Sequence, residues 1–444
     1  MGRHLGQCAV VIGAGIGGLS AAGALASYFK EIVVLERDTL PASAISRAGT
    51  PQDRHPHLLL AGGLQALGDI LPGFEKDLAR AGAVSINVFR DIRYERADVG
   101  ALPQRDCGEA ILSASRPLIE HVLRRRVAAI ANVALRSQCR VTEIVPDATR
   151  QSVRFVSGAG EIAAVEADLV VDASGRGAPT LGLLSALGWE RPPETTVGVD
   201  ISYTTALLQP EGKSSDWQIL VTLPDPRSSV LAGLILPIEG GRWLVALSQH
   251  GAPERPETWE DFLALSRQLN TPMIYNAICK LAPPDGLRHF VFDESRWRHF
   301  EQLQRLPRGI LPVADSLCRF NPIYGQGMSV AAQQAKLLCE VLDRVAAEAN
   351  PIEALQAEFL SEVGSLLQAP WNMGVNADFA YPGTRGERPE RYEESRQFEA
   401  ALFRAVAADP VVQRAFSDVL QLIKPFELLQ DPDIRRRIEA NAMA

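Results

Sequence analysis

The chain has 444 residues, of which 46% are hydrophobic and 22% charged, and its formal net charge is −8. This length allows two or three domains around a large core, and the acidic balance argues against a nucleic-acid partner. The six cysteines form no C-x-x-C pair, so we expect reduced thiols and a cytoplasmic location. Beyond the first apolar stretch nothing has the length and purity of a membrane span, and we expect no integral membrane segment.

The first stretch, residues 8–37, is predicted to form a strand, a glycine turn, a helix and a second strand. Its turn carries Gly13, Gly15 and Gly18 in the spacing G-x-G-x-x-G. The first glycine permits a tight turn, the second lets a pyrophosphate approach the backbone, and the third lets the helix pack close to the sheet. Glu36 follows Gly18 by 18 residues, where a carboxylate can bind an adenosine ribose and disfavours a 2′-phosphate. The stretch therefore predicts a site for FAD or NAD rather than NADP, and its five glycines argue against a signal peptide or a membrane helix.

The loop that follows, residues 38–51, is rich in turn-forming residues and contains Arg47. Shortly after it comes the pair His55-x-His57, and alternate residues of a strand share one face. No third ligand stands nearby, so we predict no metal site and expect this segment to place Arg47 near the cofactor.

Helices are then expected at 61–80, interrupted at Pro72-Gly73, and at 118–130. The second of these opens with Arg116-Pro117; because proline suits the first helical position, Arg116 is expected at the mouth of the helix, where phosphate, ribityl or ring contacts are available. Extended segments are expected at 84–95, 111–113, 133–145, 152–156 and 161–173, the last leading directly into Asp172-Ala173-Ser174-Gly175-Arg176.

From 195 to 249 the pattern changes to four strand-like runs separated by clusters of Pro, Gly, Asp and Ser. This pattern predicts an antiparallel sheet in a second domain. Helices are expected at 259–268 and 273–281, a short strand at 310–313 before Asp315, and a helix at 330–347. The last hundred residues are expected to be mostly helical, with an irregular break near 371–389.

Four motifs together are specific enough to suggest a family: Gly13-x-Gly15-x-x-Gly18 with Glu36; Arg47-x-Gly49-x-Pro51-Gln52 with His55-x-His57; Asp172-x-Ser174-Gly175-Arg176; and Phe320 to Met328. With them the chain resembles the flavoprotein monooxygenases of the p-hydroxybenzoate hydroxylase fold. Within that group it looks closest to the bacterial flavin epoxidases of polyether-polyketide biosynthesis, which are distant relatives of squalene epoxidase. The resemblance implies an α/β protein with a Rossmann-like βαβ FAD-binding domain (1–80, 105–180 and 300–345), an α+β antiparallel-sheet substrate domain (81–104 and 181–299) and a C-terminal helical region (346–444).

The resemblance also implies roles for individual residues. The cofactor-binding set is Gly13, Ala14, Gly15, Ile16, Gly17, Gly18, Glu36, Arg37, Arg47, Arg116, Val141, Asp315, Gly327 and Met328. The residues expected near the flavin ring are Arg47, Pro322, Gly325 and Gly327, with backbone N–H groups of 325–328 at the N1–C2=O edge.

Two departures from the family pattern stand out. The usual Gly-Asp pair is Ala314-Asp315 here, and the Asp-Gly pair that aromatic hydroxylases use in handling NAD(P)H is Ser174-Gly175. The second departure weakens the case for direct NAD(P)H binding, so the electron source is either NAD(P)H or a separate flavin reductase.

The activity that follows is epoxidation or hydroxylation of a small apolar molecule (a polyketide, a terpenoid or an aromatic), through a flavin C4a-hydroperoxide and in secondary metabolism. The cofactor carries this chemistry, so we assign no catalytic residue; Tyr203, His250, Tyr275 and Tyr324 are candidate bases, and Trp217 and Trp243 either line the pocket or pack beneath it. A flavin-dependent reductase or dehydrogenase of a prenyl-type substrate is the alternative. A halogenase is less favoured because the chain lacks a Trp-x-Trp-x-Ile-Pro run, and a flavin-binding protein without redox turnover is the remaining reading.

Overall fold

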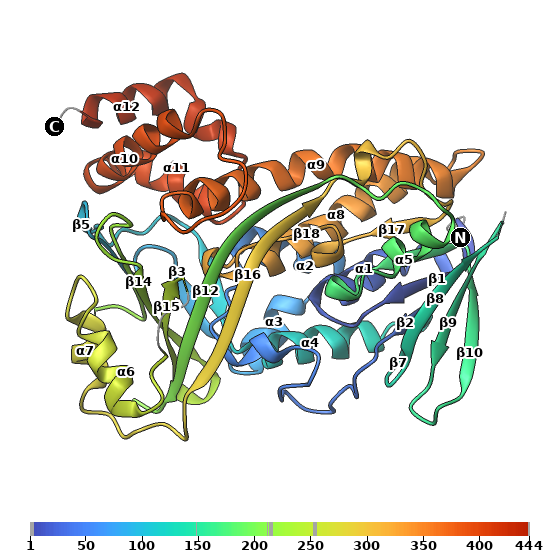
Figure 1. Ribbon diagram of the computed structural model, residues 1–444, viewed down its shortest axis with the longest axis horizontal. Helices are drawn as coiled ribbons and strands as arrows, with labels where there is room; N and C mark the ends of the chain where they lie inside the picture. Colours follow the sequence, from blue (N-terminus) through green and yellow to red (C-terminus); the bar gives the residue numbers. More distant parts are fainter. Residues whose placement is uncertain (1–3, 148, 211, 213–215, 252–254, 443–444) are drawn as a thin grey trace.

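The computed structural model describes residues 4–147, 149–210, 212, 216–251 and 255–442. Two large sheets organise the described chain: a parallel sheet with helices packed on it and a long, twisted second sheet beside it, while helices from the end of the chain gather at one extremity (Figure 1). The prediction of an α/β protein is confirmed.

The parallel sheet has five strands in the order β17-β11-β1-β2-β7. Their bounds are β1 Gly6–Ile12, β2 Phe29–Leu35, β7 Val133–Arg136, β11 Leu169–Asp172 and β17 Ile310–Pro312. All four pairings are parallel, and the centres of β1, β2, β11 and β17 are buried apolar runs, as expected when both faces are covered.

One face of this sheet is covered by helices, and the other by a small antiparallel sheet. The helices are α1 Ile16–Leu25, α2 Ala61–Ile70, α3 Phe74–Arg80, α4 Arg116–Ala128 and α8 Gly327–Val345. The small sheet has the order β10-β9-β8, with β8 Arg140–Pro146, β9 Gln151–Val156 and β10 Ile162–Ala167, and α5 Pro179–Ala186 packs against β8.

Two expected single strands are each divided between these sheets. The run 133–145 turns at Gln138, whose φ is +56°, so that β7 joins the parallel sheet and β8 joins the small one. The run 161–173 divides at Asp168, whose carboxylate accepts the backbone N–H groups of Gln7 (2.6 Å) and Cys8 (2.9 Å). Neither corner contains a glycine, proline or asparagine, the residues that usually mark a turn, which is why the sequence did not reveal them.

The second sheet has eight strands in the order β18-β16-β12-β15-β14-β13-β4-β5. Their bounds are β4 Ile92–Arg96, β5 Gly100–Ala101, β12 Glu194–Leu208, β13 Ile219–Leu223, β14 Leu231–Ile238, β15 Arg242–His250, β16 Arg288–Arg298 and β18 Cys318–Arg319. The four runs predicted between 195 and 249 pair antiparallel in this sheet, and β4, from an earlier part of the chain, joins its β13 side in parallel. The strands β3 Val84–Asn87 and β6 Ala110–Ser113 form a separate antiparallel pair.

The outer face of the eight-stranded sheet packs under α6 Trp259–Ser266 and α7 Met273–Ile278. Trp217 and Trp243 lie on this outer side with their ring centroids 5.8 Å apart, and Tyr275 is on α7 itself. The opposite face carries Tyr203 and Phe292 and joins the core that surrounds the parallel sheet.

The C-terminal region consists of α9 Pro351–Asp378, α10 Tyr392–Ala408, α11 Pro410–Leu420 and α12 Pro432–Ala442. The expected break at 371–389 begins later than predicted, because α9 continues through Pro370 to Asp378. Trp371 packs edge-on against Trp297 and Phe320, with centroids 5.7 and 6.3 Å away. This packing holds the helix past a residue that normally ends one.

Candidate functional site

The glycine turn after β1 is shaped by close backbone approaches. Gly13 has φ +101°, and a Cβ there would lie 2.7 Å from the carbonyl oxygen of Ala173; a Cβ at Gly18 would lie 1.9 Å from that of Gly13. A Cβ at Gly15 would meet no atom within 4 Å. Gly13 and Gly18 are therefore required by the fold, whereas Gly15 faces open space at the start of α1, where an anionic group can approach the helix N-terminus.

Glu36, just after the end of β2, is only 5% exposed. Its Oε2 accepts the backbone N–H of Ala14 at 2.7 Å, and its Oε1 accepts that of Asp38 at 3.0 Å. The carboxylate thus ties the glycine turn to the chain that follows β2.

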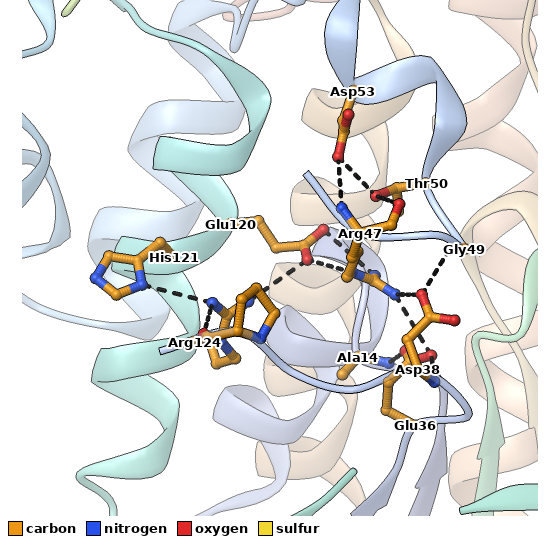
Figure 2. A network of polar contacts seen from close by, with 11 residues as sticks. Ala14, Glu36, Asp38, Arg47, Gly49, Thr50, Asp53, Glu120, His121 and Arg124 are labelled. Carbon is orange, nitrogen blue, oxygen red and sulfur yellow. Dashed lines mark hydrogen bonds and ion pairs between the residues drawn. The ribbon is translucent and has the colours of Figure 1, made fainter. Parts of the chain in front are cut away.

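Arg47 lies among three carboxylates (Figure 2). Its guanidinium is 2.7 Å from Asp38, 2.7 Å from Glu120 and 3.4 Å from Glu36. These ion pairs join the 38–54 loop to α4 and place Arg47 at the Glu36 end of the site. Asp38 and Glu120 are not among the site residues predicted from the sequence, although Arg116, Glu120 and Arg124 recur at intervals of four residues along α4, a spacing that indicates charge pairing.

Arg116 begins α4, whose N-cap is Ser115. Its Nη1 is 3.4 Å from Nε2 of His57, and its Nε is buried without a hydrogen-bond partner among the described residues. Burial lowers the pKa of Arg116, while the carboxylates of Glu120 and Asp315 oppose that shift. Arg116 therefore retains one buried donor, Nε, that no described residue engages.

Asp315 lies in a short 3-10 turn, η5 Ala314–Ser316, where α1, α8 and the middle motif meet. Its side chain is exposed, yet surrounding protein atoms raise its pKa against the influence of Arg319 and Arg116. An exposed group with this property lies in a recess. Its Cβ is 3.6 Å from the point where a Cβ on Gly175 would stand, so the middle motif borders the same recess.

The departure at Ala314 has a visible structural cost. Its φ is +52°, a left-handed conformation that glycine adopts freely and alanine does not. Its N–H donates to Oε1 of Gln334 at 2.8 Å, and its Cβ is 2.5 Å from where a Cβ on Gly17 would stand. Asp315 therefore keeps its place through a strained residue held against α1 and α8.

Asp172 of the middle motif is fully buried and has a structural role. Its carboxylate accepts hydrogen bonds from the N–H and hydroxyl of Ser174 and of Thr180, and from the hydroxyl of Ser316, at 2.7–3.1 Å. It thereby joins the end of β11 to the start of α5 and to η5.

The segment before α8 forms a second 3-10 turn, η6 Pro322–Tyr324, in which the side chain of Asn321 accepts the N–H of Ile323 at 3.1 Å. Gly325 follows with φ +67°, and Met328 is buried. A Cβ on Gly327, the first residue of α8, would meet no atom within 4 Å. Gly15 and Gly327 thus leave open space at the starts of two helices.

Residues 7–357 match a family model described as an FAD binding domain. The chain belongs to this family. It is accordingly an FAD-dependent oxidoreductase, and the features above fit the group: open space at Gly15 and Gly327, a buried acid at Glu36, and an unpartnered donor on Arg116.

Similar proteins agree with this assignment. "Protein Rv3254" of Mycobacterium tuberculosis is 32% identical over 98% of this chain and 93% of its own. A flavoprotein/dehydrogenase from Cytophaga hutchinsonii shares the fold with a TM-score of 0.67 (15% identity, 99% and 98% covered), as does p-nitrophenol 4-monooxygenase PnpA from Pseudomonas putida DLL-E4 at 0.63 (17%, 94% and 99%). The flavin-dependent brominase Bmp2 also shares it at 0.58 (14%, 98% and 93%).

On the face that joins the core around the parallel sheet, the eight-stranded sheet presents an aromatic group. The ring of Tyr203 is 6.1 Å from that of His55 and 6.2 Å from that of Phe290, and Nδ1 of His55 is 2.8 Å from the hydroxyl of Thr205. The hydroxyl of Tyr203 is buried without a hydrogen-bond partner among the described residues. Of the four candidate bases, Tyr203, His250 and Tyr324 lie on this side, whereas Tyr275 lies on α7 beyond the outer face and contacts Arg267.

A hollow of about 580 Å³ opens beside this aromatic group, between residues 46–55 and the start of β16. It is lined by Ser46, Arg47, Ala48, Pro51, Arg54, His55, Leu287, Arg288 and His289. A smaller hollow of about 270 Å³ lies between residues 40–42, α4 and β7.

The described ranges contain no group of three His, Cys, Asp or Glu residues that could hold a metal ion. In the pair His55-x-His57, Nδ1 of His57 lies 2.8 Å from the carbonyl oxygen of His55. Within the same ranges, none of the helices combines the length and the apolar character that crossing a membrane requires.

Proposed function

We propose that this FAD-dependent oxidoreductase is a monooxygenase that transfers one oxygen atom from O2 to a small, largely apolar molecule. The observation that carries the proposal is the position of the aromatic group. Tyr203 lies close enough to Asp378 for the carboxyl group to raise its pKa further, beyond the effect of burial, and Asp378 accepts a hydrogen bond from Tyr324 of η6. The aromatic group, of which His55 and Tyr203 are buried, therefore stands beside the segment proposed to carry the flavin edge.

The proposed FAD-holding residues follow the shape of the site. The turn Gly13–Gly18, including Ala14, Ile16 and Gly17, receives the pyrophosphate; Glu36, Arg37 and Val141 hold the adenosine; Arg47, Arg116 and Asp315 hold the phosphates and ribityl chain; and Pro322, Gly325, Gly327 and Met328 border the ring. Arg37 is exposed, and Val141 lies two residues beyond Cys139, whose N–H donates to the carbonyl oxygen of Glu36 at 2.8 Å. Bound and reduced, FAD supplies the activation of O2.

The ionisation of the candidate bases favours epoxidation of an alkene over hydroxylation of a phenol. Burial raises the pKa of Tyr203 and Tyr324 well above the ordinary value, and burial lowers the pKa of His250 to about 4. Both hydroxyls stay neutral and the imidazole is a weak base, so none readily removes a phenolic proton. Epoxidation needs no such step, which supports a polyketide or terpenoid alkene, in secondary metabolism, as the substrate ahead of an aromatic one.

The electron source and setting are further parts of the proposal. Electrons come from NAD(P)H directly or from a separate flavin reductase, the one macromolecular partner we propose. A cytoplasmic location is supported by the six cysteines, all of which are free thiols.

The test is oxygen uptake by the FAD-loaded protein with NADH, NADPH or a general flavin reductase, against a panel of apolar alkenes and phenols. We expect particular alkenes to accelerate oxygen uptake and yield epoxides. Substrate reduction without oxygen uptake would support the alternative, a reductase of a prenyl-type substrate. The similarity in fold to the flavoprotein/dehydrogenase from Cytophaga hutchinsonii is the reason to test it. Bromide-dependent product in the same assay would support a halogenase.

A further inference from the structure

Asp378 is the last residue of α9, and its side chain reaches the segment that precedes α8. It is 1% exposed. Its Oδ1 accepts a hydrogen bond from Nδ2 of Asn321 at 2.7 Å and another from the hydroxyl of Tyr324 at 2.7 Å. One carboxylate oxygen therefore holds both ends of η6, although 54 residues of chain separate Tyr324 from Asp378.

Gly374 makes this contact possible. It stands one turn before Asp378 on the same face of α9, and a Cβ there would lie 3.3 Å from Cδ2 and 3.4 Å from Cε2 of Tyr324. The ring of Tyr324 thus rests against a gap in the helix surface, and its hydroxyl reaches the carboxylate beyond it.

A carboxylate is an unfavourable choice for this position. The other oxygen, Oδ2, is buried with no hydrogen-bond partner among the described residues, and the C-terminal end of a helix disfavours negative charge. Burial raises the pKa of Asp378 to about 7, even though Tyr324 and Asn321 lower it. Asparagine would accept the same two hydrogen bonds without this cost, so stability alone does not explain an aspartate here.

We propose that Asp378 is a positioning residue for the flavin: through Asn321 and Tyr324 it fixes the turn that sets the starting point of α8. The inference rests on the proposed placement of the flavin edge at 325–328. The ionised carboxylate holds the two donors by charge-assisted hydrogen bonds, which are stronger than those of the neutral form. The turn is therefore held more firmly when Asp378 is ionised, and FAD affinity is expected to follow its charge.

The groups that face Asp378 come from three neighbouring elements. Tyr324 lies on η6, Tyr203 on β12 and Tyr381 just beyond α9, and the pKa of each is raised, chiefly by burial. His250 of β15 stacks on Tyr381 at 3.5 Å, and its pKa is about 4. The charged groups farther out that act on Tyr381 are Arg96, Arg396 and Glu399. Tyr203, Tyr324 and Tyr381 stay neutral and His250 stays unprotonated between pH 6 and 8.5, the range in which Asp378 changes charge.

The experiment is titration of apo-protein with FAD between pH 6 and 8.5, followed by flavin fluorescence, for wild type, Asp378→Asn and Tyr324→Phe. The matched control is Asp343→Asn, because Asp343 also accepts a tyrosine hydroxyl (Tyr28, 2.6 Å) but lies exposed on α8. We expect the wild-type and control affinities to rise about fivefold across pH 7, the equivalent of one modest hydrogen bond. Asp378→Asn is expected to be flat with pH, and Tyr324→Phe to bind FAD more weakly at every pH.

Each other outcome counts against a specific claim. An Asp378→Asn variant with the wild-type pH profile, or a Tyr324→Phe variant with unchanged affinity, would overturn the positioning role while leaving the proposed function intact. If Gly327→Val bound FAD as tightly as wild type, that result would instead overturn the placement of the flavin edge on which the inference rests.

Discussion

Substituting Gly15 and Gly18 by alanine separates the cofactor's needs from those of the fold. The backbone of Gly15 (φ −76°, ψ −177°) suits any residue, and a Cβ there meets nothing within 4 Å. Gly15→Ala should therefore fold with a free energy of unfolding within about 0.5 kcal/mol of wild type. Its methyl enters the space proposed for the pyrophosphate, so FAD affinity should fall at least tenfold, about 1.4 kcal/mol.

Gly18→Ala should behave in the opposite way. Its Cβ would stand 1.9 Å from the carbonyl oxygen of Gly13, a backbone atom that cannot move aside cheaply. Overpacking of this kind costs about 1–3 kcal/mol or more, so the apo-protein itself should lose thermal stability. The assays are thermal unfolding of the apo-proteins by circular dichroism and FAD titration of the folded ones. Wild-type FAD affinity in Gly15→Ala, and in the larger Gly15→Val, would refute the placement of the cofactor.

Three further predictions concern the surroundings of the site. Gly17→Ala should destabilise the protein because its Cβ would stand 2.5 Å from that of Ala314. Adding Ala314→Gly should restore the lost stability, and Ala314→Gly alone should raise the free energy of unfolding by about 1 kcal/mol because it relieves the positive φ. Urea unfolding of the two single variants and the double variant measures these effects. Arg47→Ala leaves three carboxylates without their buried partner and should cost about 3–5 kcal/mol in the same measurement, a result that a near-neutral variant would contradict. Because the folded-state pKa of Asp378 is raised to about 7, the folded protein binds one more proton than the unfolded chain between about pH 4 and 7, and it loses stability as the pH rises through this range. The difference in unfolding free energy between Asp378→Asn and wild type should therefore grow in favour of the variant from pH 5 to 8, by at most about 4 kcal/mol. A difference that stays constant with pH would show that Asp378 titrates normally.

The local parts of the site could be predicted because their signals are local. The spacing of Gly13, Gly15, Gly18 and Glu36 within one βαβ unit predicts the tight turn, the open space beside the helix start and the acidic residue after the second strand. The departure at Ala314 was also visible, although only the structure shows that its backbone is left-handed.

The parts that could not be predicted depend on residues far apart in sequence. The parallel pairing of β4 with β13 joins segments more than a hundred residues apart, and no periodicity within either segment reports it. The continuation of α9 past Pro370 depends on Trp371 packing against Trp297 and Phe320. The role proposed for Asp378 depends on its hydrogen bond with Tyr324, which lies 54 residues earlier in the chain.

The corners at Gln138 and Asp168 could not be predicted for a different reason. A positive φ is usually announced by glycine or asparagine, but at the first corner it falls on a glutamine. At the second, an aspartate side chain binds backbone N–H groups of β1, 160 residues away. Both runs therefore read as single strands although each serves two sheets.

The central claim is that the protein places one atom of O2 into its substrate. The most direct measurement is mass spectrometry of the product formed under ¹⁸O2 in ordinary water by the FAD-loaded enzyme, using the alkene that most accelerates oxygen uptake. We expect one ¹⁸O atom in each product molecule and none when the label is in the water. A product that has lost or gained hydrogen but carries no label from O2 would contradict it.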